Sequence, residues 1–258
     1  MITLNKMHSE NSVRTSFDAA IVGESSAHNS PAWKRVMDIL FILLAAPVVA
    51  PMMVVIAAVI KCMSKGPVLF KQERVGYKGK TFVCYKFRSM KVNAEVGSHK
   101  DHTTHLIKSS HVPMVKMDVR DSRVIPGGTI LRATGLDELP QLFNVLRGEM
   151  SLVGPRPCVP YEYEQYLPWQ KSRFNVAPGL TGLWQVSGKN LTTFNEMINM
   201  DIEYGKRQGL WLDIRIIFMT IPALWQQVKL SRAAKKAAVS VGTKAVVENP
   251  REMVGASK

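Results

Sequence analysis

The sequence predicts an α/β fold, mostly helical with short strands, behind an N-terminal membrane segment. Three observations predict this: an uncharged run from Ile39 to Ile60, short β-rich segments joined by glycine turns, and apolar residues at helical spacing in the second half of the chain. The 258 residues are 46% hydrophobic and 21% charged, which excludes a wholly disordered, collagen-like or multi-span membrane chain. Three widely separated cysteines exclude a disulfide framework and indicate a reducing compartment.

The uncharged run of 22 residues is long enough to cross a bilayer, because a helix of this length measures about 33 Å. Pro47 and Pro51 lie near its centre, where each removes a backbone donor, so we expect a kink or a break. About 30 polar residues precede the run, unlike a cleavable signal peptide. Basic residues flank both ends and give no preferred direction. Two readings stay open: a re-entrant helix-break-helix and a kinked transmembrane helix.

The net charge of +14 is concentrated in two blocks. Residues 61–91 carry nine bases against one acid, and residues 229–258 carry seven against two, whereas residues 1–60 and 92–228 are nearly balanced. Such blocks indicate polyanionic partners, which can be phosphates, nucleic acid or an anionic membrane surface.

We divide the chain into four parts. We expect residues 1–32 to form a disordered leader rich in Ser and Asn, and residues 33–62 to form the membrane segment. We expect residues 63–228 to form the folded domain, and residues 229–258 to form a basic, flexible tail.

Within the folded domain, residues 68–70 and 81–85 are predicted to form a small hairpin around a glycine turn. Helical patterns cover residues 194–205 and 212–228, and the second is either a helix at the membrane interface or a buried core helix. Four histidines in residues 92–121 are more typical of a solvated loop than of a metal site, because no Cys or carboxylate cluster accompanies them.

Asp137 and Glu138 are the acidic pair with the clearest chemical potential, at the start of a helix predicted to begin near Asp137. Adjacent side chains on a helix point about 100° apart, so one carboxylate can react while the other orients it. The free N–H groups of a helix start also favour a phosphate. The alternative is simple capping, with Asp137 as the N-cap.

Three arginines in the same stretch, Arg132, Arg147 and Arg156, could grip a phosphate through paired hydrogen bonds or form surface salt bridges. Prolines on both sides of Arg156 fix its backbone and hence the direction of its side chain. The chain has no GxSxG, P-loop, HExxH or GxGxxG motif, which removes several hydrolase and nucleotide-binding classes.

Together these motifs resemble the bacterial sugar transferases, the monotopic phosphoglycosyl transferases that begin polysaccharide assembly on polyprenyl phosphate. The resemblance rests on six blocks in order: WKRVMDILF (33–41), GPVLFKQERVGYKGKTFVCYKFRSMKV (66–92), LRATGLDELPQLFNVLRGEMSLVGPRP (131–157), PGLTGLWQVSGKN (178–190), MDIEY (200–204) and LDIRII (212–217). The leader and the tail lie outside it.

The resemblance implies a re-entrant membrane helix broken at Pro47, and a cytosolic catalytic domain that rests on the membrane through interfacial amphipathic helices. It implies the bacterial cytoplasmic (inner) membrane, with this domain facing the cytoplasm. The implied enzyme transfers a hexose-1-phosphate, galactose or glucose, from a UDP-sugar to polyprenyl (undecaprenyl) phosphate and releases UMP. This would be the first step of exopolysaccharide or related glycan assembly, with downstream glycosyltransferases as further partners and no nucleic acid.

The resemblance also implies roles for individual residues. Asp137 would be the nucleophile that forms an aspartyl-phosphosugar and the contact for Mg²⁺, and Glu138 would assist it. The expected substrate-binding residues are Arg132, Arg156, Asp201, Lys86 and Arg88. A rival from another class is a membrane-tethered adaptor whose basic blocks bind anionic lipid or nucleic acid.

Overall fold

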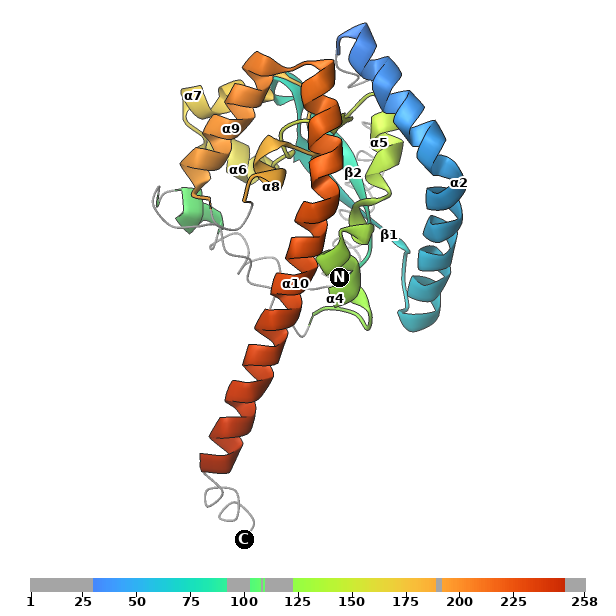
Figure 1. Cartoon of the computed structure of the whole chain (residues 1–258), viewed down its shortest axis with the longest axis vertical. Helices are drawn as coiled ribbons and strands as arrows, with labels where there is room; N and C mark the ends of the chain where they lie inside the picture. Colours follow the sequence, from blue (N-terminus) through green and yellow to red (C-terminus); the bar gives the residue numbers. More distant parts are fainter. Residues whose placement is uncertain (1–29, 92–102, 108, 110–122, 189–191, 249–258) are drawn as a thin grey trace, which may run out of the picture.

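The computed structural model describes residues 30–91, 103–107, 109, 123–188 and 192–248 (Figure 1). The described chain is mostly helical and has two small two-stranded sheets, so the predicted α/β class with short strands is confirmed. Predictions for the leader up to residue 29, for most of residues 92–121 and for residues 249–258 lie outside the described residues.

The membrane segment forms one α-helix, α2 (Ala32–Met63), within one residue of the predicted limits at each end. Its 32 residues correspond to a length of about 48 Å. Pro47 and Pro51 lie inside the helix, which stays continuous and changes direction near its middle (Figure 1). In the described part of the chain, α2 is the one helix long and apolar enough to cross a membrane. The prolines therefore produce a bend without interrupting the helix.

Both halves of α2 pack against the same folded body. In the first half, Ile42 lies in a cluster with Phe82 and Val145, and in the second half Ile60 lies in a cluster with Phe87. The opposite side of the helix exposes large apolar side chains, namely Leu40, Leu43, Leu44, Val48, Val54, Val55 and Val59. The helix thus has one side fixed to the protein and another side that only an apolar environment would cover.

The predicted hairpin is confirmed and is longer than expected. Strands β1 (Leu69–Val75) and β2 (Thr81–Phe87) pair antiparallel along their full length. The turn between them, η1 (Tyr77–Gly79), places Lys78 and Gly79 at φ of 52° and 78°. Glycine adopts this left-handed conformation without strain, which explains the glycine at the end of the turn.

A second sheet was not predicted. Strands β3 (Ser151–Val153) and β4 (Gly179–Thr181) pair in parallel, each only three residues long. The backbones approach so closely beside this pair that a Cβ on Gly154 would lie 2.2 Å from the oxygen of Ala177. The segment between the strands contains the short helices α6 (Pro160–Gln165), α7 (Pro168–Lys171) and η4 (Ser172–Asn175).

The acidic pair follows helix α4 (Gly128–Thr134), which ends at Gly135 with φ of 74°. Asp137 and Glu138 lie in the 3₁₀ turn η3 (Leu136–Glu138), and the α-helix α5 (Gln141–Arg147) begins only after it. The predicted helix start near Asp137 was therefore about one turn too early. Pro140 explains the difference, because it has no N–H to form the first α-helical hydrogen bond across this turn.

The C-terminal part consists of α8 (Leu183–Val186), α9 (Phe194–Arg207) and α10 (Leu210–Glu248). Both longer helices were predicted, and α9 starts with a capping box between Thr193 and Glu196. Helix α10 packs against α4, α8 and β3 and projects far beyond the body, so the helix continues past the boundary predicted at residue 228 (Figure 1).

Helix α10 has two different faces. Asp213 and Ile216 are buried in the body, whereas Trp211, Phe218 and Trp225 are 80%, 63% and 66% exposed. A purely buried core helix does not account for the exposed face. Contact of this face with the membrane interface stays a prediction.

Candidate active site

Glu138 lies between two cations that come from distant parts of the chain. Lys86, near the end of β2, places its Nζ 2.8 Å from Glu138 Oε1, and Arg156, which follows β3, places its Nη1 3.2 Å from the same oxygen. All three side chains are partly accessible, with 15–33% of their surface exposed. The fold thus brings Glu138, Lys86 and Arg156 together at the surface, as the resemblance implied.

Asp137 differs from its neighbour. Among the described residues, no hydrogen bond or ion pair engages its carboxylate, and neither η3 nor α5 has a side-chain cap. Burial raises the pKa of Asp137, and the adjacent charge of Glu138 adds to this, while Lys86, Arg132 and Arg156 act in the opposite direction. The capping alternative is therefore wrong, and Asp137 is a half-buried carboxylate surrounded by cationic charge.

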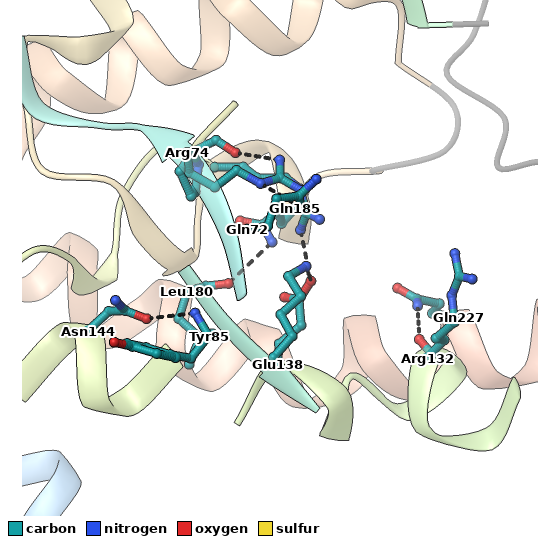
Figure 2. A network of polar contacts seen from close by, with 12 residues as sticks. Gln72, Arg74, Tyr85, Arg132, Glu138, Asn144, Leu180, Gln185 and Gln227 are labelled. Carbon is teal, nitrogen blue, oxygen red and sulfur yellow. Dashed lines mark hydrogen bonds and ion pairs between the residues drawn. The ribbon is translucent and has the colours of Figure 1, made fainter. Parts of the chain in front are cut away.

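Arg132 approaches Asp137 from α4. Gln227 of α10 donates to the Arg132 carbonyl at 3.4 Å, and Figure 2 shows the two residues side by side, apart from Glu138. The charge of Arg132 lowers the pKa of Asp137. A contact between α10 and α4 therefore supports one wall of the site.

Arg156 is held by its backbone as well as by its side chain. Arg173 Nη2 donates to the Arg156 carbonyl at 3.0 Å, and Arg74 Nη1 donates to the Pro157 carbonyl at 3.1 Å. Figure 2 shows Arg74 with Gln72, whose side-chain oxygen accepts two further hydrogen bonds from it. The charge of Glu138 raises the pKa of Arg156, so Arg156 stays cationic.

Two predicted substrate-binding residues do not lie on this surface. Arg88 is 5% exposed and donates to the Ser64 carbonyl at the end of α2, at 2.9 Å. Asp201 is 1% exposed and forms an ion pair with Arg173, at 2.5 Å. Burial raises the pKa of Asp201 to about 6. Both are packed in the protein interior, where a direct contact with a substrate has no geometric support.

Arg147 contacts an aromatic side chain of β2. Its Nη1 donates to the Tyr85 hydroxyl at 2.7 Å, and its guanidinium lies 5.2 Å from the centre of the Tyr85 ring. The contact joins α5 to β2.

Arg74 and Arg173 have no signal in the sequence that marks them as part of the site. Arg74 is one of nine bases in residues 61–91, and Arg173 lies in a polar stretch without a motif. Only the burial of Arg173, the partial burial of Arg74 and the bonds of both to neighbouring carbonyls distinguish them, and these are properties of the folded chain.

Asp137 and Glu138 are the residues of this site that could hold a divalent cation such as Mg²⁺. In the described ranges, no group of three or more His, Cys, Asp or Glu side chains is arranged to hold a metal ion. Mg²⁺ commonly binds through one or two carboxylates, phosphate oxygens and water, so Asp137 with the adjacent Glu138 is a sufficient protein contribution.

A partly buried carboxylate among lysine and arginine side chains, on a body packed against a long apolar helix, is an arrangement that suits the binding of phosphate esters. The model of one family, bacterial sugar transferase, matches residues 29–227. The chain belongs to the bacterial sugar transferase family, which confirms the resemblance seen in the motifs.

Individual relatives agree with this family assignment. The chain is 45% identical over 157 residues to the galactosyl transferase CpsE of Streptococcus agalactiae, covering 60% of this chain and 34% of CpsE. It is 36% identical over 191 residues to the exopolysaccharide production protein ExoY of Sinorhizobium fredii, covering 74% and 84%. It is 40% identical over 195 residues to a UDP-glucose:undecaprenyl-phosphate glucose-1-phosphate transferase of Xanthomonas campestris, covering 72% and 37%. The chain thus spans most of ExoY and little more than a third of the other two.

Proposed function

We propose that this protein transfers a hexose-1-phosphate from a UDP-sugar to undecaprenyl phosphate and releases UMP. The single observation that carries the proposal is the state of Asp137: its carboxylate has no partner among the described residues and lies within the field of Lys86, Arg132 and Arg156. The names of the relatives support a galactose or glucose donor and the undecaprenyl carrier.

In the proposed first step, an Asp137 oxygen attacks the β-phosphorus of the UDP-sugar. The bond from this phosphorus to the bridging oxygen breaks, and UMP leaves with that oxygen and its electron pair. In the second step, a phosphate oxygen of undecaprenyl phosphate attacks the same phosphorus and restores the Asp137 carboxylate. The product is an undecaprenyl diphosphosugar, and the covalent intermediate divides one difficult transfer into two.

The surrounding residues have distinct tasks in this scheme. Only ionised Asp137 is a nucleophile, and the three cations oppose the effect of burial on its pKa. Glu138 holds Lys86 and Arg156 beside it, where both can stabilise the charge of a diphosphate. Mg²⁺ held at Asp137, with Glu138 adjacent, would neutralise part of the same charge.

We further propose that α2 is re-entrant and that the body faces the cytoplasm. A helix that crossed the bilayer would place its ends on opposite faces, yet the two halves of α2 contact one body. Lys34 and Asp38, near its start, are buried against that body. Basic residues at both ends favour the cytoplasmic side for each. The exposed face of α10 would then lie at the membrane interface, and the product would pass to downstream glycosyltransferases.

The test is UMP release from a panel of UDP-sugars by the protein in nanodiscs with undecaprenyl phosphate and Mg²⁺. We expect release with UDP-galactose or UDP-glucose and its loss in Asp137→Asn. Glu203→Gln is the matched control, because Glu203 is a surface carboxylate in an ion pair with Arg207. Release retained in Asp137→Asn would overturn the covalent mechanism. Salt-sensitive lipid binding without release from any donor would overturn the reaction and favour the adaptor.

A further inference from the structure

A buried ion pair lies behind the candidate active site. Arg173, in η4, and Asp201, in α9, are 2% and 1% exposed, and Arg173 Nη2 lies 2.5 Å from Asp201 Oδ2. The other terminal nitrogen of Arg173 donates to the Tyr166 hydroxyl at 3.3 Å. Nothing in the proposed reaction requires a charged pair at this depth.

The same Arg173 Nη2 donates to the backbone carbonyl of Arg156 at 3.0 Å. Arg74 holds the next carbonyl, that of Pro157, so two guanidinium groups fix consecutive peptide units. The Arg156 side chain leaves this fixed segment and reaches Glu138. Asp201 is therefore connected to Glu138 through Arg173 and the Arg156 backbone.

Stability alone does not account for the pair. Burying two charges costs more than a well-packed apolar pair of similar volume in many proteins. In the described part of the chain, Arg173 Nε has no hydrogen-bond partner, and neither Asp201 oxygen has one with good geometry. A pair that leaves buried polar atoms unsatisfied is better explained by what it holds in place.

We propose that Arg173 and Asp201 are positioning residues that set the Arg156 backbone, and thereby aim its guanidinium at the nucleotide diphosphate. This inference rests on the proposed function. Arginine is required at position 173 because its planar fork can bond a carboxylate, a carbonyl and a hydroxyl at once, and an ammonium group lacks this geometry. The Asp201 carboxylate compensates the buried positive charge of Arg173.

The test is a double-mutant cycle with Arg173→Lys and Arg156→Lys, measured by UMP release. We expect Arg173→Lys to lower kcat/KM by about 10- to 100-fold, the scale for a misplaced binding group. In the Arg156→Lys background, the same change should lower kcat/KM by less than about threefold, because the group it positions is already gone. Arg207→Lys, on exposed α9 surface, is the matched control and should leave kcat/KM unchanged.

If Arg173→Lys lowers kcat/KM equally in the wild-type and Arg156→Lys backgrounds, the two residues act independently and the inference is overturned. A purely structural role would also overturn it, and would be recognised by an equal decrease of the folded fraction in the two backgrounds. If Arg173→Lys does not fold, Asp201→Asn replaces it in the cycle, with the same expected coupling.

If the wild-type protein releases no UMP from any donor, the proposed function fails. The double-mutant cycle is then measured by the rise in melting temperature that UDP and Mg²⁺ cause. If Arg173→Lys reduces this rise in the wild type but not in the Arg156→Lys background, the positioning role of Arg173 and Asp201 is supported. An absent rise, or one unaffected by Arg173→Lys, would overturn it.

Discussion

Replacing Lys34 with methionine should lower the free energy of unfolding by about 3–5 kcal/mol, the cost of leaving one partner of a buried ion pair alone. Lys34 forms an ion pair with Asp213, and its Nζ donates to the Tyr204 hydroxyl at 2.9 Å. The Tyr204 hydroxyl in turn donates to Asp213 at 2.8 Å. All three side chains are at most 1% exposed, so water cannot replace the lost ammonium group.

The size of the loss in unfolding free energy follows from the groups that stay buried after Lys34 is replaced. Without Lys34, the bond from Tyr204 is the one side-chain hydrogen bond that the described residues still give the Asp213 carboxylate, and burial already raises the pKa of Asp213. The double variant Lys34→Met/Asp213→Asn removes both charges of this pair, while Asp38 stays buried beside it. We therefore expect the double variant to lose less free energy of unfolding than the two single variants lose together, by about 1–3 kcal/mol.

Thermal unfolding in nanodiscs measures both quantities. A loss of 3–5 kcal/mol corresponds to a decrease in Tm of about 6–20 °C for a domain of this size. The control is Lys206→Met on the exposed side of α9, which should change stability by less than about 0.5 kcal/mol. A change of less than about 1 kcal/mol for Lys34→Met, or single losses that simply add, would refute the reasoning.

Three further predictions concern the body of the protein. Asn144→Leu should lower the free energy of unfolding, measured by chemical denaturation, by about 2–4 kcal/mol, because the buried side-chain amide forms hydrogen bonds of 2.7 and 3.1 Å with two backbone groups of β2. A loss below about 1 kcal/mol would contradict this. Because folding raises the pKa of Asp201 to about 6, the folded state binds its proton more tightly. The free energy of unfolding of the wild type, relative to that of Asp201→Asn, should therefore rise by about 2 kcal/mol as the pH falls from 7 to 4. A difference that stays flat or falls would contradict this prediction. Gly154→Ala should prevent folding in expression and circular-dichroism assays, because its Cβ would meet a backbone oxygen at 2.2 Å. Gly127→Ala, with φ of 75° and open space, should cost only about 1 kcal/mol, and equal behaviour of the two variants would argue against steric exclusion.

The features predicted correctly from the sequence are local or are carried by motifs. The core of α2 follows from one uncharged run, and the hairpin follows from two β-rich segments around a glycine turn. Asp137 and Glu138 were identified because they are adjacent, and Arg156 because prolines flank it. The start of α5 was misplaced because one missing N–H, at Pro140, changes the hydrogen bonding of a whole turn.

The features that were missed depend on pairs far apart in the chain. Lys34 and Asp213 are separated by 179 positions, and neither has a local motif that reveals the other. Strands β3 and β4 have three residues each, too short for a recognisable alternation. Asp201 and Arg88 were expected to bind substrate, yet the fold buries both side chains.

The sequence by itself determined the long apolar helix, the class of fold, the family and the adjacent acidic pair, because hydrophobic runs, turn residues and ordered motifs act over short stretches of chain. Only the tertiary structure decided which charges surround Asp137, which arginines hold the backbone of Arg156 and how both halves of α2 attach to one body. These depend on which side chains lose contact with water together, and burial of charge is decided when distant segments pack.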